Sequence, residues 1–191
     1  MKQLLSVALL GLGITACAQQ AAAPPPQAAP PPSTAITDSV KAVFTDVKGN
    51  LTKSLEQFPE KDLGFKPVGV IAEVRGFGQI IAHVAAEQYL FCGPVSAEKK
   101  PDNVDEKTLS ALKKADLQKA LADSFAFCDR AFASINDQTG AAPAEITEFS
   151  YKSTKLGLLA FNNAHDDEHY GNLVTYMRAK KMVPPSSQPS K

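Results

Sequence analysis

The stretch Asn162–Arg178 reads N-N-A-H-D-D-E-H-Y-G-N-L-V-T-Y-M-R and holds two of the chain's three histidines, His165 and His169. A separation of four residues places both imidazoles on one face of a helix, one turn apart. The third histidine, His83, belongs to a separate helical stretch far upstream. We therefore expect a helical fold that brings the three rings around one metal ion.

Four stretches repeat apolar residues at steps of three and four, which is the pattern of amphipathic helices. They run from Ile36 to Phe58, from Gly76 to Phe91, from Asp116 to Ile135 and from Ser153 to Lys181. The segment Glu145–Tyr151 alternates too weakly to predict a strand. Four such helices without a strand predict an all-α protein with a four-helix bundle.

The first 17 residues have the layout of a secretory signal peptide. Lys2 provides a positive start, Leu4–Leu12 an apolar run, and Ile14–Cys17 a small-residue ending; the apolar run is too short to span a membrane. Cys17 resembles the lipidated cysteine of a bacterial lipobox, and ordinary signal cleavage after Ala18 is the alternative. Lipid chains on Cys17 would hold the protein on a membrane face. Because Ala18 carries no charge that would favour retention at the inner membrane, we expect an outer-membrane lipoprotein facing the periplasm.

The rest of the chain divides into three parts. Residues 18–35 form an Ala/Pro-rich linker with extended polyproline character, at about 3.1 Å per residue. Residues 36–183 contain the four helical stretches and make one domain of ordinary size, and residues 184–191 form a polar, flexible tail. The 20 Lys and Arg residues balance the 20 Asp and Glu residues, so no basic excess points to nucleic acid.

The three histidines fall on or beside the apolar stripes of their helices. Asn162 and several acidic residues surround two of them, and burying so many polar groups is costly unless they pair or coordinate a metal. Three imidazoles leave a coordination position open for water or substrate, whereas a structural zinc site usually has four protein ligands. Nitrogen ligands suit zinc, nickel or copper. Histidines that serve only as core residues, without a metal, are the alternative.

Three polar residues are best placed to assist such a site. Glu87 follows His83 by one helical turn, and Asn162 and Asp166 accompany the downstream histidines. Groups of this kind form hydrogen bonds with metal ligands and so fix their orientation. We expect Glu87 or Asp166 to orient a bound molecule or move a proton, and Asn162 to contact a ligand.

The segment Val74–Val84, followed far downstream by His165–Asn172, resembles the DinB-like superfamily, and the similarity extends over Ile36–Ser186. The resemblance implies a four-helix bundle whose helices two and three run parallel and are joined by a long connection. It also implies a divalent metal, zinc or nickel, bound by His83, His165 and His169. Characterised members include thiol-dependent transferases and isomerases, many others have no known activity, and bundles of this family often form homodimers.

The parallel helices implied by the resemblance would place Cys92 and Cys128 near the same end of the bundle. Because an exported protein meets oxidising conditions, a disulfide between them is one expectation. It would close the long connection and contribute roughly 3–4 kcal/mol to stability. Two reduced, buried cysteines that pack as small apolar residues are the alternative.

Two functions of different classes remain after this reasoning. The first is an exported metalloenzyme with hydrolase or thiol-transferase chemistry on an unknown small molecule. The second is a non-catalytic lipoprotein that binds a metal or a partner at the cell envelope. In both, the lipid anchor is the expected contact with the membrane.

Overall fold

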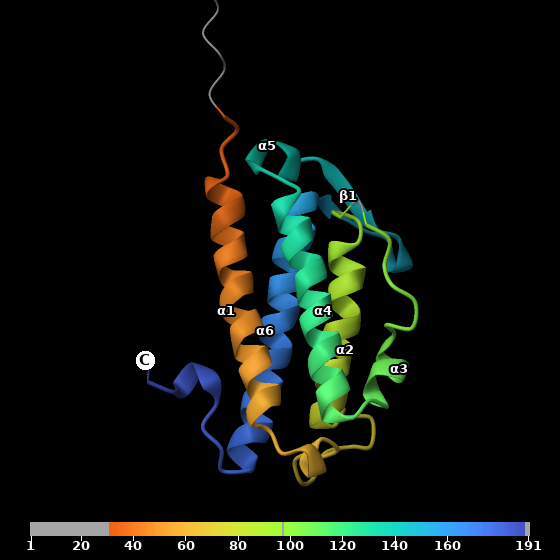
Figure 1. Cartoon of the computed structure of the whole chain (residues 1–191), viewed down its shortest axis with the longest axis vertical. Helices are drawn as coiled ribbons and strands as arrows, with labels where there is room; N and C mark the ends of the chain where they lie inside the picture. Colours follow the sequence, from red (N-terminus) through yellow and green to blue (C-terminus); the bar gives the residue numbers. More distant parts are fainter. Residues whose placement is uncertain (1–30, 97, 190–191) are drawn as a thin grey trace, which may run out of the picture. The chain divides into compact units, whose positions relative to one another are not determined.

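The computed structural model describes residues 31–96 and 98–189, and in this part of the chain four long helices form a bundle (Figure 1). These helices are α1 (Ala35–Gln57), α2 (Phe77–Cys92), α4 (Lys114–Ala133) and α6 (Lys155–Ala179). Each lies within a few residues of a predicted stretch. The prediction of an all-α four-helix bundle is therefore confirmed. The predicted signal peptide, Cys17 and residues 18–30 of the linker lie outside the described residues.

The four helices form a ring of neighbours. Helix α2 packs against α4 and α6, and α1 packs against the same two helices from the opposite side. Figure 1 shows that α2 and α4 run in one direction and α1 and α6 in the other. The parallel arrangement of the second and third long helices is thus confirmed. Within the described ranges, no helix is long and apolar enough to cross a membrane.

Phenylalanine side chains fill much of the space between the helices. Phe58 at the end of α1 stacks on Phe77 at the start of α2, with ring centroids 3.6 Å apart. Phe44 of α1 contacts Phe125 and Phe132 of α4, with centroids 5.9 and 5.2 Å apart. Each buried ring stabilises the fold by about 1.5–3 kcal/mol relative to an exposed one. These contacts attach α1 to both parallel helices.

The connection between α4 and α6 contains a hairpin, in a region for which the sequence analysis assigned no strand. Strand β1 (Pro143–Ile146) pairs antiparallel with β2 (Tyr151–Thr154). The 3₁₀ helix η2 (Thr147–Phe149) and Ser150, with a φ of 55°, make the turn. Only Ile146 of β1 is fully buried. Two four-residue strands with one anchoring side chain give almost no alternation for sequence analysis to detect.

Four further short elements lie in the connections and at the end of the chain. They are η1 (Glu60–Asp62), α3 (Glu106–Ser110), α5 (Asp137–Gly140) and η3 (Pro185–Ser187). Helix η3 falls in the segment predicted as a flexible tail. There the hydroxyl of Tyr170 donates a 2.7 Å hydrogen bond to Ser186 Oγ and accepts one of 2.9 Å from Ser186 N. Ser186 of η3 is therefore hydrogen-bonded to α6.

The starts of α6 and α1 are capped in different ways. Thr154 Oγ1 accepts the Gly157 N–H at 3.0 Å and caps α6. At α1 the capping group comes from α5, because Asp137 Oδ1 accepts the N–H groups of Ile36 and Thr37 at 3.1 and 2.9 Å. A carboxylate at a helix N-terminus is favourable because the free N–H groups and the helix dipole both attract negative charge.

Candidate metal centre

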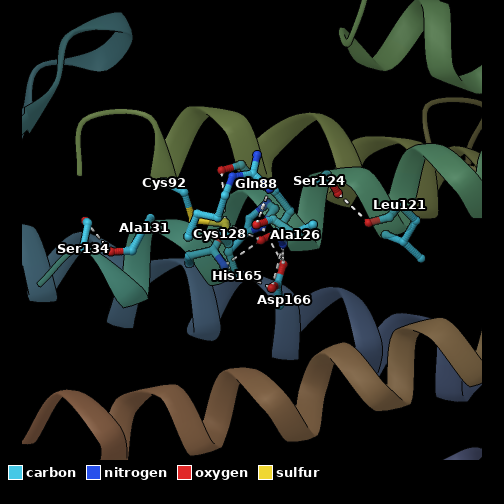
Figure 2. The surroundings of a disulfide bond; sticks show 12 residues. Gln88, Cys92, Leu121, Ser124, Ala126, Cys128, Ala131, Ser134, His165 and Asp166 are labelled. Carbon is cyan, nitrogen blue, oxygen red and sulfur yellow. Dashed lines mark hydrogen bonds and ion pairs between the residues drawn. A yellow bond between two sulfur atoms is a disulfide. The ribbon is translucent and has the colours of Figure 1, made fainter. Parts of the chain in front are cut away.

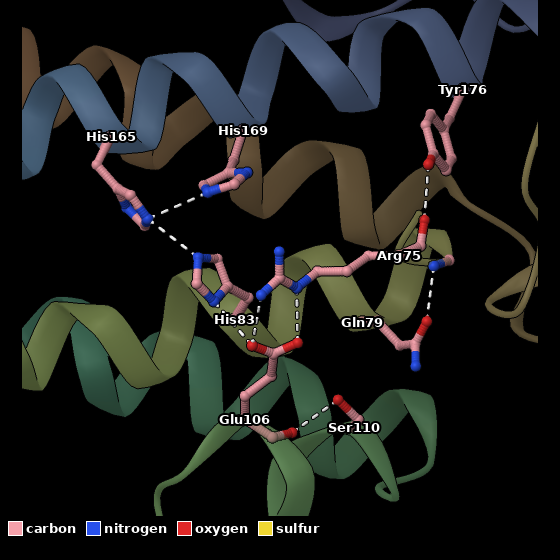
Figure 3. Close-up of polar contacts among 9 residues, drawn as sticks. Arg75, Gln79, His83, Glu106, Ser110, His165, His169 and Tyr176 are labelled. Atoms are coloured by element: carbon pink, nitrogen blue, oxygen red, sulfur yellow. Dashed lines mark hydrogen bonds and ion pairs between the residues drawn. The ribbon is translucent and has the colours of Figure 1, made fainter. Parts of the chain in front are cut away.

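The packing of α2 against α6 brings the three histidines together (Figure 3). His83 Nε2 lies 3.1 Å from His165 Nε2, and His169 Nε2 lies 3.1 Å from the same atom. One ring nitrogen from each residue lies within 4.8 Å of the other two. His165 and His169 occupy successive turns of α6, as their spacing predicted, while the tertiary fold supplies His83.

This geometry fits a divalent metal ion. With zinc–nitrogen bonds of about 2.0–2.1 Å in tetrahedral geometry, neighbouring ligand nitrogens stand about 3.3 Å apart. Three Nε2 atoms facing one another cannot all be paired by hydrogen bonds, because each neutral ring has only one N–H to share between its two nitrogens. A cation at the centre would satisfy the three lone pairs at once. The cluster therefore has the geometry of a divalent-metal site.

A carboxylate supports this cluster from behind His83. Oε2 of Glu106 lies 2.9 Å from His83 Nδ1, as Figure 3 shows. Glu106 also accepts two hydrogen bonds from Arg75, at 2.7 Å from Nε and 3.0 Å from Nη2. The Arg75 guanidinium lowers the pKa of Glu106 and keeps it ionised. An ionised carboxylate only accepts, so Nδ1 of His83 carries the proton and Nε2 presents its lone pair to the cluster.

The protein environment also favours neutral imidazoles. Burial lowers the pKa of His83, and the charge of Arg75 lowers it further. Burial also lowers the pKa of His169 to about 3, with a contribution from the neighbouring His165. Since metals bind the unprotonated nitrogen, both residues are available as ligands at neutral pH.

A buried polar network lies next to the cluster (Figure 2). Gln88 Nε2 lies 2.7 Å from each carboxylate oxygen of Asp166. Asn162 Nδ2 donates to Gln88 Oε1 at 3.0 Å and to Asp166 Oδ2 at 3.2 Å. Burial raises the pKa of Asp166. Its Oδ1 lies 3.8 Å from His165 Nδ1, beyond hydrogen-bond distance. The network holds α2 and α6 together directly behind the histidines.

Cys92 and Cys128 form a disulfide that joins α2 to α4 (Figure 2). Their Cα atoms are 5.3 Å apart, within the usual range for a bridge. The Cys128 sulfur lies 3.0 Å from Gln88 Oε1. A disulfide sulfur carries no proton, so this is a packing contact rather than a donated hydrogen bond. Gln88 therefore lies between the cross-link and the polar network.

The structure places the predicted assisting residues at different distances from the cluster. Asp166 and Asn162 are fully buried in the network described above. Glu87 is half-buried. The hydrogen bond with Glu106 raises the pKa of Arg75, and the charge of Glu87 adds a smaller contribution. The carboxylate that contacts a histidine is instead Glu106, which sequence reasoning missed. The pattern Asp105–Ser110 carries a helix-capping signal, since Asp105 accepts the Thr108 N–H, but nothing local indicates that Glu106 faces α2.

A small pocket of about 230 Å³ adjoins the cluster at His169. Its other lining residues come from the segment before α2, from α2 and from α6: Glu73, Val74, Arg75, Ile80, Asn172 and Tyr176. The Tyr176 hydroxyl donates a 2.6 Å hydrogen bond to the carbonyl oxygen of Arg75 and so fixes the segment before α2 (Figure 3). His169 of the cluster therefore borders this pocket.

Comparison with known proteins agrees with the fold. Residues 43–173 match the DinB superfamily, and because this match covers more than half of the sequence, the chain belongs to that superfamily. The three-histidine cluster thus lies in a chain of the DinB superfamily.

Two solved structures share the bundle. One is a mycothiol-dependent maleylpyruvate isomerase, which is 15% identical to this chain, with a TM-score of 0.57. The other is a mutant form of mycothiol-dependent maleylpyruvate isomerase, at 14% identity and a TM-score of 0.58. Each alignment covers 72% of this chain and 60% of the isomerase. The chain therefore spans less than two thirds of the isomerases' length, and the similarity is one of fold. No curated protein matches the chain.

Proposed function

We propose that this chain is a metal-dependent enzyme that acts on a small molecule at the three-histidine centre. The observation that carries the proposal is the convergence of the Nε2 atoms of His83, His165 and His169 beside the pocket at His169. Three imidazole ligands leave a coordination position open for a ligand. A divalent ion, zinc or nickel, supplies Lewis acidity there when bound, and this activates water or a thiol.

The residues around the centre have distinct roles in this proposal. Glu106 holds the His83 ring in the tautomer and orientation that a metal ligand requires. Arg75 keeps Glu106 ionised and also lines the pocket, where it adds positive charge. Glu87, one turn beyond His83, is the candidate group for moving a proton, and Asp166 stiffens the support behind His165.

Two reaction types fit this site. Thiol transfer is suggested by the isomerases that share the fold, whose names describe them as mycothiol-dependent. Hydrolysis requires only water as the second reactant, which suits a protein outside the cytoplasm. We propose that one of these two reactions takes place at an electrophilic atom, such as a carbon, of a small molecule.

We further propose that the protein is exported and anchored by lipid on Cys17 at the periplasmic face of the outer membrane. The order of the N-terminal segments supports this location, as does the Cys92–Cys128 disulfide, which suits an oxidising compartment. Labelling of growing cells with radioactive palmitate tests the anchor. Label that is incorporated into the wild type and lost in Cys17→Ser is expected; equal labelling of both would contradict it.

A non-catalytic role is the second candidate. The three ligands come from α2 and α6, so a bound metal would cross-link two helices of the bundle. Such a cross-link stabilises the folded state and needs no substrate. A protein that uses the site in this way would offer a stable binding surface at the cell envelope and would catalyse no reaction.

Metal analysis of protein purified without a polyhistidine tag tests the site itself. About one equivalent of zinc or nickel is expected in the wild type and in Asp167→Asn, an exposed control on α6. His83→Ala and His169→Ala are expected to lose it. No metal in the wild type, even after reconstitution, would contradict the proposal.

The same His169→Ala variant separates the two functions. An enzyme site predicts that turnover is lost while the melting temperature changes little. A structural site predicts a large fall in melting temperature, similar to the fall caused by a chelator in the wild type.

A further inference from the structure

The connection between α1 and α2 contains a loop that is closed at its base. The Phe77 N–H donates to the carbonyl oxygen of Phe65 at 3.1 Å and brings the two ends of the loop together. Inside it, the Lys66 ammonium donates to the carbonyl oxygen of Ala72 at 2.7 Å and ties the two arms to each other. Gly69 turns the chain between them with a φ of 83°, which favours glycine. Compact surface loops whose ends lie close together are frequently functional.

Apolar side chains project from this turn into solvent. Val68 is fully exposed, Ile71 is 69% exposed and Val70 is 41% exposed. They are three of the seven large apolar side chains that are exposed in residues 31–96 and 98–189. All three lie within residues 68–71, which we call the apolar tip. Single apolar side chains on a surface are normal, whereas clustered ones indicate a contact surface.

The end of the bundle that carries the apolar tip is basic. Figure 1 shows the connection between α1 and α2 beside the end of α6, at the end of the bundle opposite to the start of α1. In agreement, Lys180 Nζ lies 3.0 Å from Asp62 Oδ2 and 5.1 Å from the Phe65 ring centroid. Residues 60–74 and 178–183 together hold five basic residues and three acidic ones. The basic residues are Lys61, Lys66, Arg178, Lys180 and Lys181. This excess favours an anionic partner.

A lipid surface fits the shape and the charge of this end of the bundle. The side chains of the apolar tip stand out from the molecule, so their partner must let them sink in. The boundary between the headgroups and the acyl chains of a bilayer accepts projecting apolar side chains. Anionic headgroups at the same depth attract lysine and arginine.

We propose that the apolar tip is a membrane-docking surface, which inserts into the headgroup region of an anionic bilayer while the nearby basic residues contact lipid phosphates. The inference depends neither on a bound metal nor on a reaction. Glu73 and Val74, which follow the tip in the same loop, also line the pocket at His169. A docked loop would therefore bring that pocket close to the membrane surface.

The test relies on the absence of tryptophan from the chain. Val68→Trp places a single tryptophan in the apolar tip of the full chain, which is mixed with vesicles of phosphatidylglycerol and phosphatidylethanolamine that have brominated acyl chains. Bromine quenches tryptophan fluorescence only at short range, so quenching reports entry into the bilayer. We expect a blue shift and strong quenching for Val68→Trp.

Ile36→Trp is the matched control, because Ile36 is an exposed apolar residue at the start of α1. It should show neither a blue shift nor quenching. An N-terminal segment that holds the chain on the vesicle does so equally in both variants, so only the position of the tryptophan differs.

Two further comparisons test the chemistry of docking. Val68→Trp combined with Ile71→Asp should lose most of the quenching, because insertion would take a carboxylate out of water. Brominated phosphatidylcholine vesicles, which carry no net charge, should quench Val68→Trp more weakly, because the attraction to anionic lipid is lost.

Several results would overturn the proposal. Quenching of Ile36→Trp without quenching of Val68→Trp would show that the opposite end of the bundle faces the membrane, and quenching of neither would show that no docking occurs. Quenching that is unchanged by Ile71→Asp, or equal with phosphatidylcholine, would contradict the roles of the apolar tip and of the basic residues. A blue shift of Val68→Trp that needs no vesicles and grows with protein concentration would instead indicate contact between copies of the chain.

Discussion

Glu106 accepts a hydrogen bond from Nδ1 of His83 at 2.9 Å, although the two residues are 23 positions apart and lie on different helices. The same carboxylate accepts hydrogen bonds from Nε and Nη2 of Arg75. The contact fixes which nitrogen of His83 faces the cluster. It therefore links the long connection between α2 and α4 to the metal centre.

Replacement of Glu106 by glutamine should weaken metal binding by about 10–100-fold, the usual effect of losing such a supporting carboxylate. The amide keeps the size of the side chain but loses the charge that pairs with Arg75. Titration with zinc against a competing chelator measures the change. Glu98→Gln, which removes a different glutamate–arginine pair, should leave the affinity unchanged. An unchanged affinity in Glu106→Gln would refute the supporting role.

The metal-free protein should lose stability as the pH falls below about 6.5. This pH is well above the range in which most carboxylates become protonated. The folded state holds the pKa of His169 at about 3, whereas the ordinary value is 6.5. Between these values the unfolded chain binds a proton and the folded chain does not, so stability falls as the pH falls. The slope approaches about 1.4 kcal/mol per pH unit for one such group.

Urea unfolding of chelator-treated protein between pH 7 and pH 4 measures this slope. In His169→Gln the slope should be smaller, because one of the histidines with a lowered pKa is gone. The same pH dependence in wild type and His169→Gln would show that His169 does not titrate as the structure requires.

Loss of the Cys92–Cys128 bridge should lower the free energy of unfolding by roughly 3–4 kcal/mol, because the bridge closes a loop over a sequence separation of 36. The double substitution Cys92→Ala/Cys128→Ala, compared with the wild type by urea unfolding, measures the loss. Each alanine also removes a buried sulfur, so the wild type treated with a reductant provides a second comparison. A midpoint that moves in neither case would mean that the bridge adds no stability.

Asp137→Asn should lower the melting temperature at neutral pH, since the carboxylate caps α1 through the N–H groups of Ile36 and Thr37. Hydrogen bonds from Ser33 and this helix start lower the pKa of Asp137 to about 2, from 3.8. The stabilisation is thus complete above pH 4 and is lost as the pH falls toward 2. The difference between variant and wild type should shrink over this range. Asp102→Asn, at an exposed aspartate with a distant partner, should show no such difference at any pH.

The sequence alone determined the helices and the candidate ligands, because both depend on short-range spacing. Apolar residues at steps of three and four reflect the helical repeat, and the four-residue separation of His165 and His169 places them on one face of α6. Because the chain has three histidines, His83 was the remaining candidate for the third metal ligand. These features need no knowledge of distant contacts.

Only the tertiary structure decided which other groups support the site. Glu106 lies on a five-residue helix in the long connection between α2 and α4, and its approach to His83 depends on how that connection folds over α2. Glu87 and Asp166 looked equally suitable from their spacing, yet Asp166 pairs with Gln88 inside the core. The hairpin at Ile146 was missed for a different reason, because two four-residue strands with one fully buried side chain show almost no alternation. The contacts around the histidines form between segments distant in sequence, and local periodicity carries no information about which segments meet.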